Sequence, residues 1–135
     1  MEQKIKHLEF IQGVINRMSN NSFILKGWSV TLISALFALS ANNANGFFVF
    51  LAYIPAICFW GLDGYFLSQE RKFRELYNKV ASLKPENIDF LMNTSEFNSI
   101  QKTGWLSSTF SRTLFVFHGA LIGAIIIVMI FLTKN

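Results

Sequence analysis

Charged residues are scarce in this chain, and that scarcity excludes a soluble domain of ordinary composition. Of 135 residues, only 15% are charged, whereas 52% are hydrophobic and 16% are aromatic. A soluble domain usually carries about 25% charged residues. So small a core could not hide the excess of apolar side chains, and the sequence therefore predicts one domain with lipid as its solvent.

Cysteines and recognisable catalytic motifs are also lacking. The lone cysteine, Cys58, cannot form a disulfide within the chain. The sequence has no paired-cysteine or His-x-x-x-His spacing for a metal, no glycine-rich phosphate loop and no nucleophile elbow. The two histidines, His7 and His118, lie far apart in the sequence. We therefore expect no enzyme, no metal site and no cofactor.

Long apolar runs are present instead, and three of them predict transmembrane helices. They cover residues 22–41, 47–66 and 110–132, with Trp105 as an alternative start of the third. Each is about long enough to cross a hydrocarbon core of roughly 30 Å. The polar turn at residues 42–46 is too short for anything but a helical hairpin. Pro55 predicts a kink in the second span, and the first stretch could alternatively be re-entrant.

The other segments predict helices outside the membrane and complete an all-α integral membrane protein. Residues 1–21 predict a separate amphipathic helix, lying on the membrane surface or against another cytoplasmic helix. The polar run at 19–22 predicts a break that caps the next helix. Residues 67–104 predict a helical cytoplasmic region, in which the second helix continues to about Leu83 and ends at Lys84-Pro85. We expect Pro85 to start a further helix and residues 93–103 to be irregular or weakly helical.

The basic residues predict the orientation of the chain. The N-terminal region up to Lys26 and the 67–112 connection hold eleven of the twelve Lys and Arg residues. Because cytoplasmic segments carry the excess of positive charge, we expect the N-terminus and this connection in the cytoplasm. The hairpin turn and the C-terminus would then lie on the other side.

Asp63 is the sharpest candidate for a functional residue. A carboxylate inside a span is costly and usually faces a partner or a water-filled cavity. Asp63 lies near the expected cytoplasmic end of the second span. Three basic side chains at a similar depth in the other two spans are its candidate partners: Lys26, Arg112 and His118. Alternatively, Asp63 lies in the headgroup zone and is solvated. His118 could titrate and gate the protein, or simply hydrogen-bond a neighbouring helix.

Two patterns of small residues predict close packing or a pore. Gly119 and Gly123 form a G-x-x-x-G pattern in the third span. In the first span, a small and partly polar stripe follows the helical period: Gly27, Thr31, Ser34 and Ala38. This stripe either packs a helix or lines a pore, and three spans could build a pore only from several copies. The candidate pore or gating residues are therefore Thr31, Ser34, Asp63 and His118.

A basic run beyond the second span offers a candidate ligand site. Its members, with Phe73 and Tyr77 interleaved, are Arg71, Lys72, Arg74, Lys79 and Lys84. These basic residues can act only to set the orientation of the chain in the membrane and to attract anionic lipid. Alternatively it forms a cytoplasmic anion or nucleotide site where several subunits converge. Glu70 and Glu75 partly neutralise it.

Two stretches within residues 7–80, HLEFIQGVINRMSNNSFILKGWSVTLISALFALSA and FWGLDGYFLSQERKFRELY, carry a resemblance. They resemble small bacterial membrane proteins of anti-phage defence, specifically the transmembrane effector that accompanies a nucleotidyltransferase in Hailong-type systems. The resemblance implies an oligomeric channel in the bacterial inner membrane. An oligonucleotide made by the partner nucleotidyltransferase would hold it shut, and release of that ligand would depolarise an infected cell.

Two functions are consistent with these observations. The first is a homo-oligomer, expected to be a tetramer, whose spans form an ion-permeable pore gated from the cytoplasmic side. The second is a non-conducting membrane anchor or accessory subunit, in which residues 1–21 and 67–104 recruit a soluble partner.

Overall fold

Helices make up all the regular structure that the computed structural model describes, which covers residues 1–43 and 45–135. The long elements are α1 (Glu2–Asn43), α3 (Tyr53–Ser82) and α5 (Arg112–Lys134). The short ones are α2 (Phe47–Leu51), α4 (Trp105–Thr109) and three 3-10 turns at Pro85–Asn87, Ser95–Phe97 and Gln101–Thr103. The predicted all-α class is therefore confirmed. Ala44, in the expected hairpin turn, lies outside the described residues.

Three helical segments are long and apolar enough to cross a membrane, so we describe the chain as a membrane protein. They comprise residues 2–42, 47–82 and 112–134. The first two contain 41 and 36 residues, about twice the number that spans a hydrocarbon core of roughly 30 Å. About half of each of these helices must therefore extend beyond the membrane.

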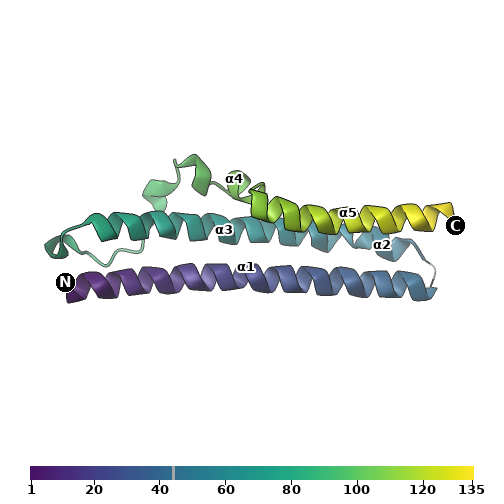
Figure 1. The fold of residues 1–135 in the computed structure, drawn as a ribbon, viewed down its shortest axis with the longest axis horizontal. Coiled ribbons are helices and arrows are strands. Elements are labelled where there is room, and N and C mark those ends of the chain that lie inside the picture. The colour runs from purple at the N-terminus through teal and green to yellow at the C-terminus, as the bar shows by residue number, and fades with distance from the viewer. Residues whose placement is uncertain (44) are drawn as a thin grey trace.

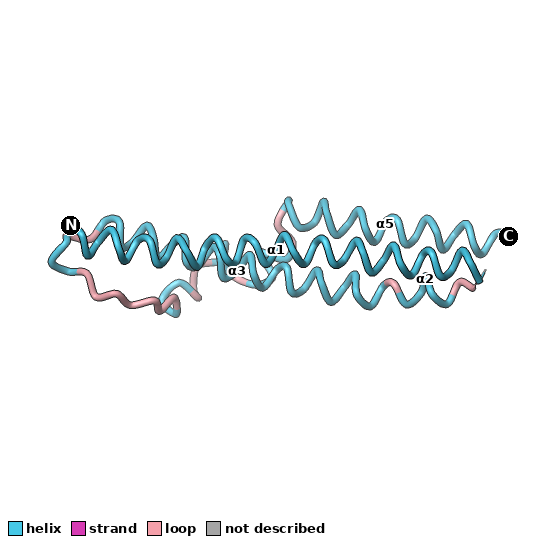
Figure 2. The backbone as a smooth tube through the Cα atoms, turned by 90° about the horizontal axis from the view of Figure 1, so that it is seen from below, coloured by secondary structure: helices cyan, strands magenta, loops and turns pink. Residues whose placement is uncertain are grey.

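The arrangement of the helices divides the molecule lengthwise into two parts (Figures 1 and 2). Helix α1 lies beside α2 and α3 along the whole molecule, whereas α5 covers only the end that holds α2 and the C-terminus. We call residues 22–42, 47–66 and 112–134 the three-helix segment. We call residues 2–21 and 67–104 the extension, where the chain from Leu83 to Gly104 folds back along α3.

Each part has its own apolar core. In the three-helix segment, one side chain from α1 and one from α5 pack with residues near the start of the second span: Ile33, Val49, Ala52, Ala56 and Ile125. In the extension, the N-terminal turns of α1 pack on the C-terminal turns of α3 and on the connection: Ile11, Ile15, Leu76, Val80 and Phe97. Burial of these side chains fixes α1 against α3 at both ends.

The expected break at residues 19–22 is wrong, because α1 is one continuous helix of 42 residues. Residues 1–21 are therefore the beginning of α1 and not a separate helix. The physical reason is packing at both ends of α1, which outweighs the weak helical preference of Ser and Asn. Ser19 and Asn20 are exposed on the helix surface, and Ser22 uses its hydroxyl for a contact with α3.

Pro55 lies in the third position of α3, and the helix is interrupted one turn earlier. The amide of Ala52 donates to Val49 O, a tighter bond than the α-helical pattern, between α2 and α3. Pro55 cannot donate a backbone hydrogen bond, and its ring crowds the preceding turn of the helix. The tighter bond at Ala52 accommodates both effects. The predicted distortion of the second span therefore occurs at Ala52 and divides α2 from α3.

The connection differs from the predicted helical region. Helix α3 continues to Ser82, close to the expected end, but Pro85 begins only a three-residue turn. Residues 88–94 contain no helix, and residues 95–103 contain two further 3-10 turns. The third span also starts later than either expected residue, because α4 is a separate short helix and α5 begins at Arg112.

Helix α4 lies so close to α3 that Gly64 has no room for a side chain. A Cβ atom at this position would overlap the side chain of Thr109 and would lie 3.0 Å from its Cα. At Gly61, one turn earlier, a Cβ would meet only a ring atom of Trp105 at 3.7 Å, an ordinary contact. The two indole N–H groups reinforce this packing: Trp60 Nε1 donates to Thr109 O at 2.7 Å, and Trp105 Nε1 donates to Gly61 O at 2.9 Å.

We predict that Gly64→Ala destabilises the protein by about 1–3 kcal/mol, because α4 must move away from α3. Gly61→Ala is the matched control and should leave the melting temperature nearly unchanged. Thermal unfolding of the detergent-purified variants, followed by circular dichroism, measures both effects. Equal stability of the two variants would contradict the close approach of α4 to α3.

Candidate functional site

Asp63 is the centre of a buried polar cluster that joins all three spans. Its side chain is fully buried. Its Oδ2 atom lies 2.6 Å from Lys26 Nζ and 2.8 Å from His118 Nε2. Its Oδ1 atom accepts a hydrogen bond from Ser22 Oγ. One carboxylate therefore contacts α1 twice and α5 once, from its place in α3.

The helices bring these residues together in one layer of the membrane. Ser22 and Lys26 are four residues apart and so lie on the same face of α1, where Lys26 Nζ also donates to Ser22 Oγ at 2.8 Å. Lys26, Asp63 and His118 each lie sixteen residues from the far end of their candidate span, at Asn42, Phe47 and Lys134 respectively. Sixteen residues correspond to about 24 Å of helix. The cluster thus lies near one face of a core of roughly 30 Å, where the extension begins.

The charges of Asp63 and Lys26 compensate each other. A buried carboxylate is costly unless it is paired and its remaining acceptor sites are filled, and here three side chains fill them. The Lys26 side chain keeps 20% of its surface exposed and lies 5.8 Å from the centre of the Phe117 ring. The pair is therefore reachable from outside only on the lysine side.

His118 completes the cluster as a hydrogen-bond donor. Because a carboxylate only accepts, Nε2 carries the hydrogen that binds Asp63. Its Nδ1 atom is buried and has no partner in the described residues. The ring of Trp60 stacks on the imidazole, with 5.8 Å between centroids and 9° between planes. His118 therefore holds α5 to α3 through a polar contact and an aromatic contact.

The predicted partners of Asp63 are confirmed for Lys26 and His118 but not for Arg112. Arg112 is exposed and makes no ion pair with a described residue. The alternative that Asp63 is solvated in the headgroup zone is wrong, since the side chain is completely buried.

The structure does not bring Thr31 and Ser34 to Asp63. Both residues, with Gly27 and Ala38, are exposed on a face of α1 that no other described helix covers. The buried face of α1 carries Ser29, Ile33 and Ser40 instead. The four candidate pore or gating residues are therefore two separate pairs, one inside the subunit and one on its outer surface.

Gly119 and Gly123 also face open space. A Cβ atom at either position would have no neighbour within 4 Å. Their pattern does not pack another helix of the same chain.

The candidate ligand residues are divided among several contacts. Arg71 donates to Lys102 O at 2.7 Å, Arg74 pairs with Glu70 at 2.8 Å, and Lys79 pairs with Glu96 at 2.6 Å. Lys72 and Lys84 make no ion pair with a described residue. The run is thus a partly neutralised surface at the end of α3 and just beyond it, with Lys72 and Lys84 free of ion pairs in the described structure.

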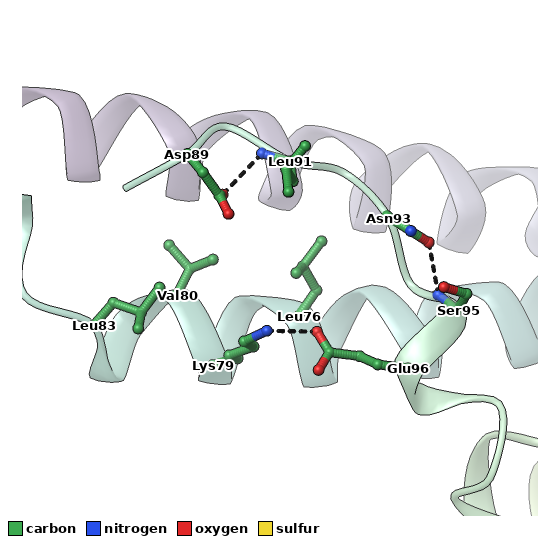
Figure 3. Close-up of a pocket in the computed structure, with 9 residues that line it drawn as sticks. All are labelled: Leu76, Lys79, Val80, Leu83, Asp89, Leu91, Asn93, Ser95 and Glu96. Carbon is green, nitrogen blue, oxygen red and sulfur yellow. Dashed lines mark hydrogen bonds and ion pairs between the residues drawn. The ribbon is translucent and has the colours of Figure 1, made fainter. Parts of the chain in front are cut away.

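A pocket lies between the end of α3 and the connection (Figure 3). Leu76 and Val80 point from α3 toward the backbone near Leu91, and the Lys79–Glu96 pair closes one side. Asp89 and Asn93 use their side-chain oxygens for turns, accepting from the amides of Leu91 and Ser95. The polar atoms of this pocket therefore mainly stabilise the connection itself.

Three residues that form these contacts are not predicted by the sequence patterns. Ser22 was interpreted as a cap, although its four-residue spacing from Lys26 was a signal that both face the same neighbour. Trp60 had no signal beyond its place one turn before Asp63. His7 is fully buried and lies 3.0 Å from Leu91 O, so it holds the connection against α1; no sequence pattern linked these two residues.

The chemistry available to the Asp63 cluster is ion pairing and hydrogen bonding among fixed groups. The described residues contain no group of three or more His, Cys, Asp or Glu side chains that could hold a metal ion. What the arrangement does directly is connect three apolar helices through polar contacts that lipid cannot replace.

We predict that Lys26→Met is more damaging than Asp63→Asn. The first variant leaves a buried carboxylate without its cation and should cost about 3–5 kcal/mol. The second keeps one side-chain oxygen, which can accept from His118 Nε2, and its amide N–H can donate to Ser22 Oγ, while Lys26 can turn toward water. The double variant should recover much of the stability lost in Lys26→Met, which thermal unfolding of all three in a double-mutant cycle would measure.

Lys79→Met serves as the control, because Lys79 and Glu96 are about half exposed and such a pair contributes about 0–1 kcal/mol. If Lys26→Met were no less stable than this control, Asp63 would not depend on Lys26.

Comparisons with protein families, curated proteins and solved structures found no match to this chain.

Proposed function

We propose that this protein is an oligomeric membrane effector whose copies together form an ion-permeable pore. The observation that carries the proposal is the exposed polar stripe on α1. Gly27, Thr31, Ser34 and Ala38 lie on a span surface that the other helices leave uncovered. Polar side chains that face lipid find no favourable polar interaction there. The same stripe facing a water-filled axis between copies can line a path for ions.

The path lies between copies and not within one. Inside each copy the space between the spans is filled by apolar side chains such as Ile33, Ala56 and Ile125. Asp63 is occupied by Lys26 and His118. Thr31 and Ser34 then face the ions. Asp63 and His118 keep the subunit rigid, and they act on gating because they hold the angle between α3 and α5.

The extension is the regulated part, and the distribution of Lys and Arg supports a cytoplasmic location for it. The N-terminus is then cytoplasmic and the protein belongs to a bacterial inner membrane. Lys72 and Lys84, free of ion pairs in the described structure, join Arg71, Arg74 and Lys79 in binding an anionic ligand where copies meet. The resemblance to Hailong-type effectors suggests a tetramer and an oligonucleotide from a partner nucleotidyltransferase as that ligand, in defence against phage.

A non-conducting anchor is the second candidate, and one observation favours it. Arg74 and Lys79 are paired with Glu70 and Glu96, which lowers the positive potential available to an oligonucleotide. In that case the extension would bind a soluble protein, and the protein in detergent would be monomeric or would assemble only with that partner.

Ion flux from liposomes that contain the purified protein alone tests the proposal. We expect flux from the wild type, suppression by short oligonucleotides, and a decrease of about tenfold in Ser34→Leu, which places an apolar side chain in the path.

The matched control is Leu32→Phe, an exposed position about 160° around the helix from Ser34, and it should conduct like the wild type. Equal flux from all three proteins would exclude the stripe as the path. The absence of flux from a monomeric wild type would favour the anchor.

A further inference from the structure

A second feature of the three-helix segment is an apolar groove on its surface, with a volume of about 440 Å³. Figure 1 shows α4 beside α3 at the start of α5, and residues of these three helices border the groove. Its lining comes from all three helices and from the residue that follows α4: Ile57, Cys58, Trp60, Gly61, Trp105, Leu106, Thr109, Phe110 and Ile122. It shares Trp60, whose ring stacks on His118, with the Asp63 cluster, and it is separate from the stripe on α1.

The groove offers almost no hydrogen bond to a ligand. The indole N–H of Trp60 and that of Trp105 already donate to backbone carbonyls. The hydroxyl of Thr109 donates to Trp105 O at 2.7 Å. The remaining surface is aromatic rings and aliphatic side chains, and such a surface selects hydrocarbon over a polar ligand.

The lining of the groove includes Phe110, two residues before α5, and Ile122, within α5. From Arg112 to Ile122, α5 rises about 15 Å, which is half of a hydrocarbon core of roughly 30 Å. An acyl chain that lies along this part of α5 can therefore contact the lining.

A positively charged residue lies close to the groove along the chain. Arg112 follows Phe110 by two residues, is exposed, and makes no ion pair with a described residue. The chain contains no Asp or Glu from residue 97 to its end, so no acidic side chain of α4 or α5 lies beside Arg112. The N-terminus of α5 adds a smaller positive potential at the same place. A guanidinium at the membrane surface prefers a phosphate that it can bind with two N–H groups.

We propose that the groove binds one acyl chain of an anionic phospholipid whose phosphate pairs with Arg112. The lipid comes from the surrounding leaflet and fills the space between α4, α3 and α5. This site does not depend on whether the protein conducts ions, because it lies on a single copy.

Quenching of tryptophan fluorescence by brominated lipids tests the proposal. The chain has three tryptophans, so the Trp28→Phe variant leaves only Trp60 and Trp105, both in the groove. The protein is reconstituted in phosphatidylcholine vesicles that contain a minor fraction of either brominated phosphatidylglycerol or brominated phosphatidylcholine. We expect the anionic lipid to quench severalfold more than the same fraction of the neutral lipid. Equal quenching would overturn the proposal.

Two pairs of variants in this background locate the site. Arg112→Gln should abolish the preference for phosphatidylglycerol, whereas Lys134→Gln, at the other end of α5, should preserve it. Cys58→Phe fills the groove and should reduce quenching, whereas Ile54→Phe, one turn away and outside the lining, should not. A preference that survives Arg112→Gln, or unchanged quenching in Cys58→Phe, would show that the lipid binds elsewhere.

Discussion

The carboxylate of Asp63 is the constraint on which the arrangement of the three spans depends. An unpaired charge in a membrane span costs about 2.5–3.5 kcal/mol or more, so the helices must supply partners. Lys26 and Ser22 come from α1 and His118 comes from α5. Apolar packing alone would allow helices to slide and rotate in lipid, whereas these directed contacts define one register among the three.

The position of this cluster also separates two parts with different physical roles. On one side, the three-helix segment has an apolar core and an uncovered stripe on α1. On the other side, α1 and α3 continue into the extension, where Ile11, Ile15, Leu76 and Val80 hold them together. Because both helices are uninterrupted through the cluster, a ligand that moves the extension would change forces on Asp63 and its partners directly. In the function proposed above, this continuity is the physical basis for control of the membrane part by a ligand of the extension.

Much of the architecture could be predicted because hydrophobic runs and the cost of a buried charge are local signals. The spans, the continuation of α3 and the pairing of Asp63 with Lys26 and His118 follow from these signals. The continuity of α1 could not be predicted, since Ser19 and Asn20 favour a cap when considered alone and only packing against α3 overrides them. Likewise, helical periodicity groups Thr31 with Ser34 but does not say which face of α1 meets α3. The contact of His7 with Leu91 joins distant residues through an irregular connection that has no pattern to read.

The distance between the Lys26 ammonium and the Asp63 carboxylate in a lipid bilayer tests the central claim most directly. Solid-state NMR of protein labelled with ¹⁵N at lysine Nζ and ¹³C at aspartate Cγ can measure it, since Asp63 and Asp89 are the two aspartates of the chain. The structure, with 2.6 Å between Nζ and Oδ2, predicts a strong dipolar coupling that Lys26→Met removes. A spectrum without this coupling, or one that Lys26→Met leaves unchanged, would contradict the account.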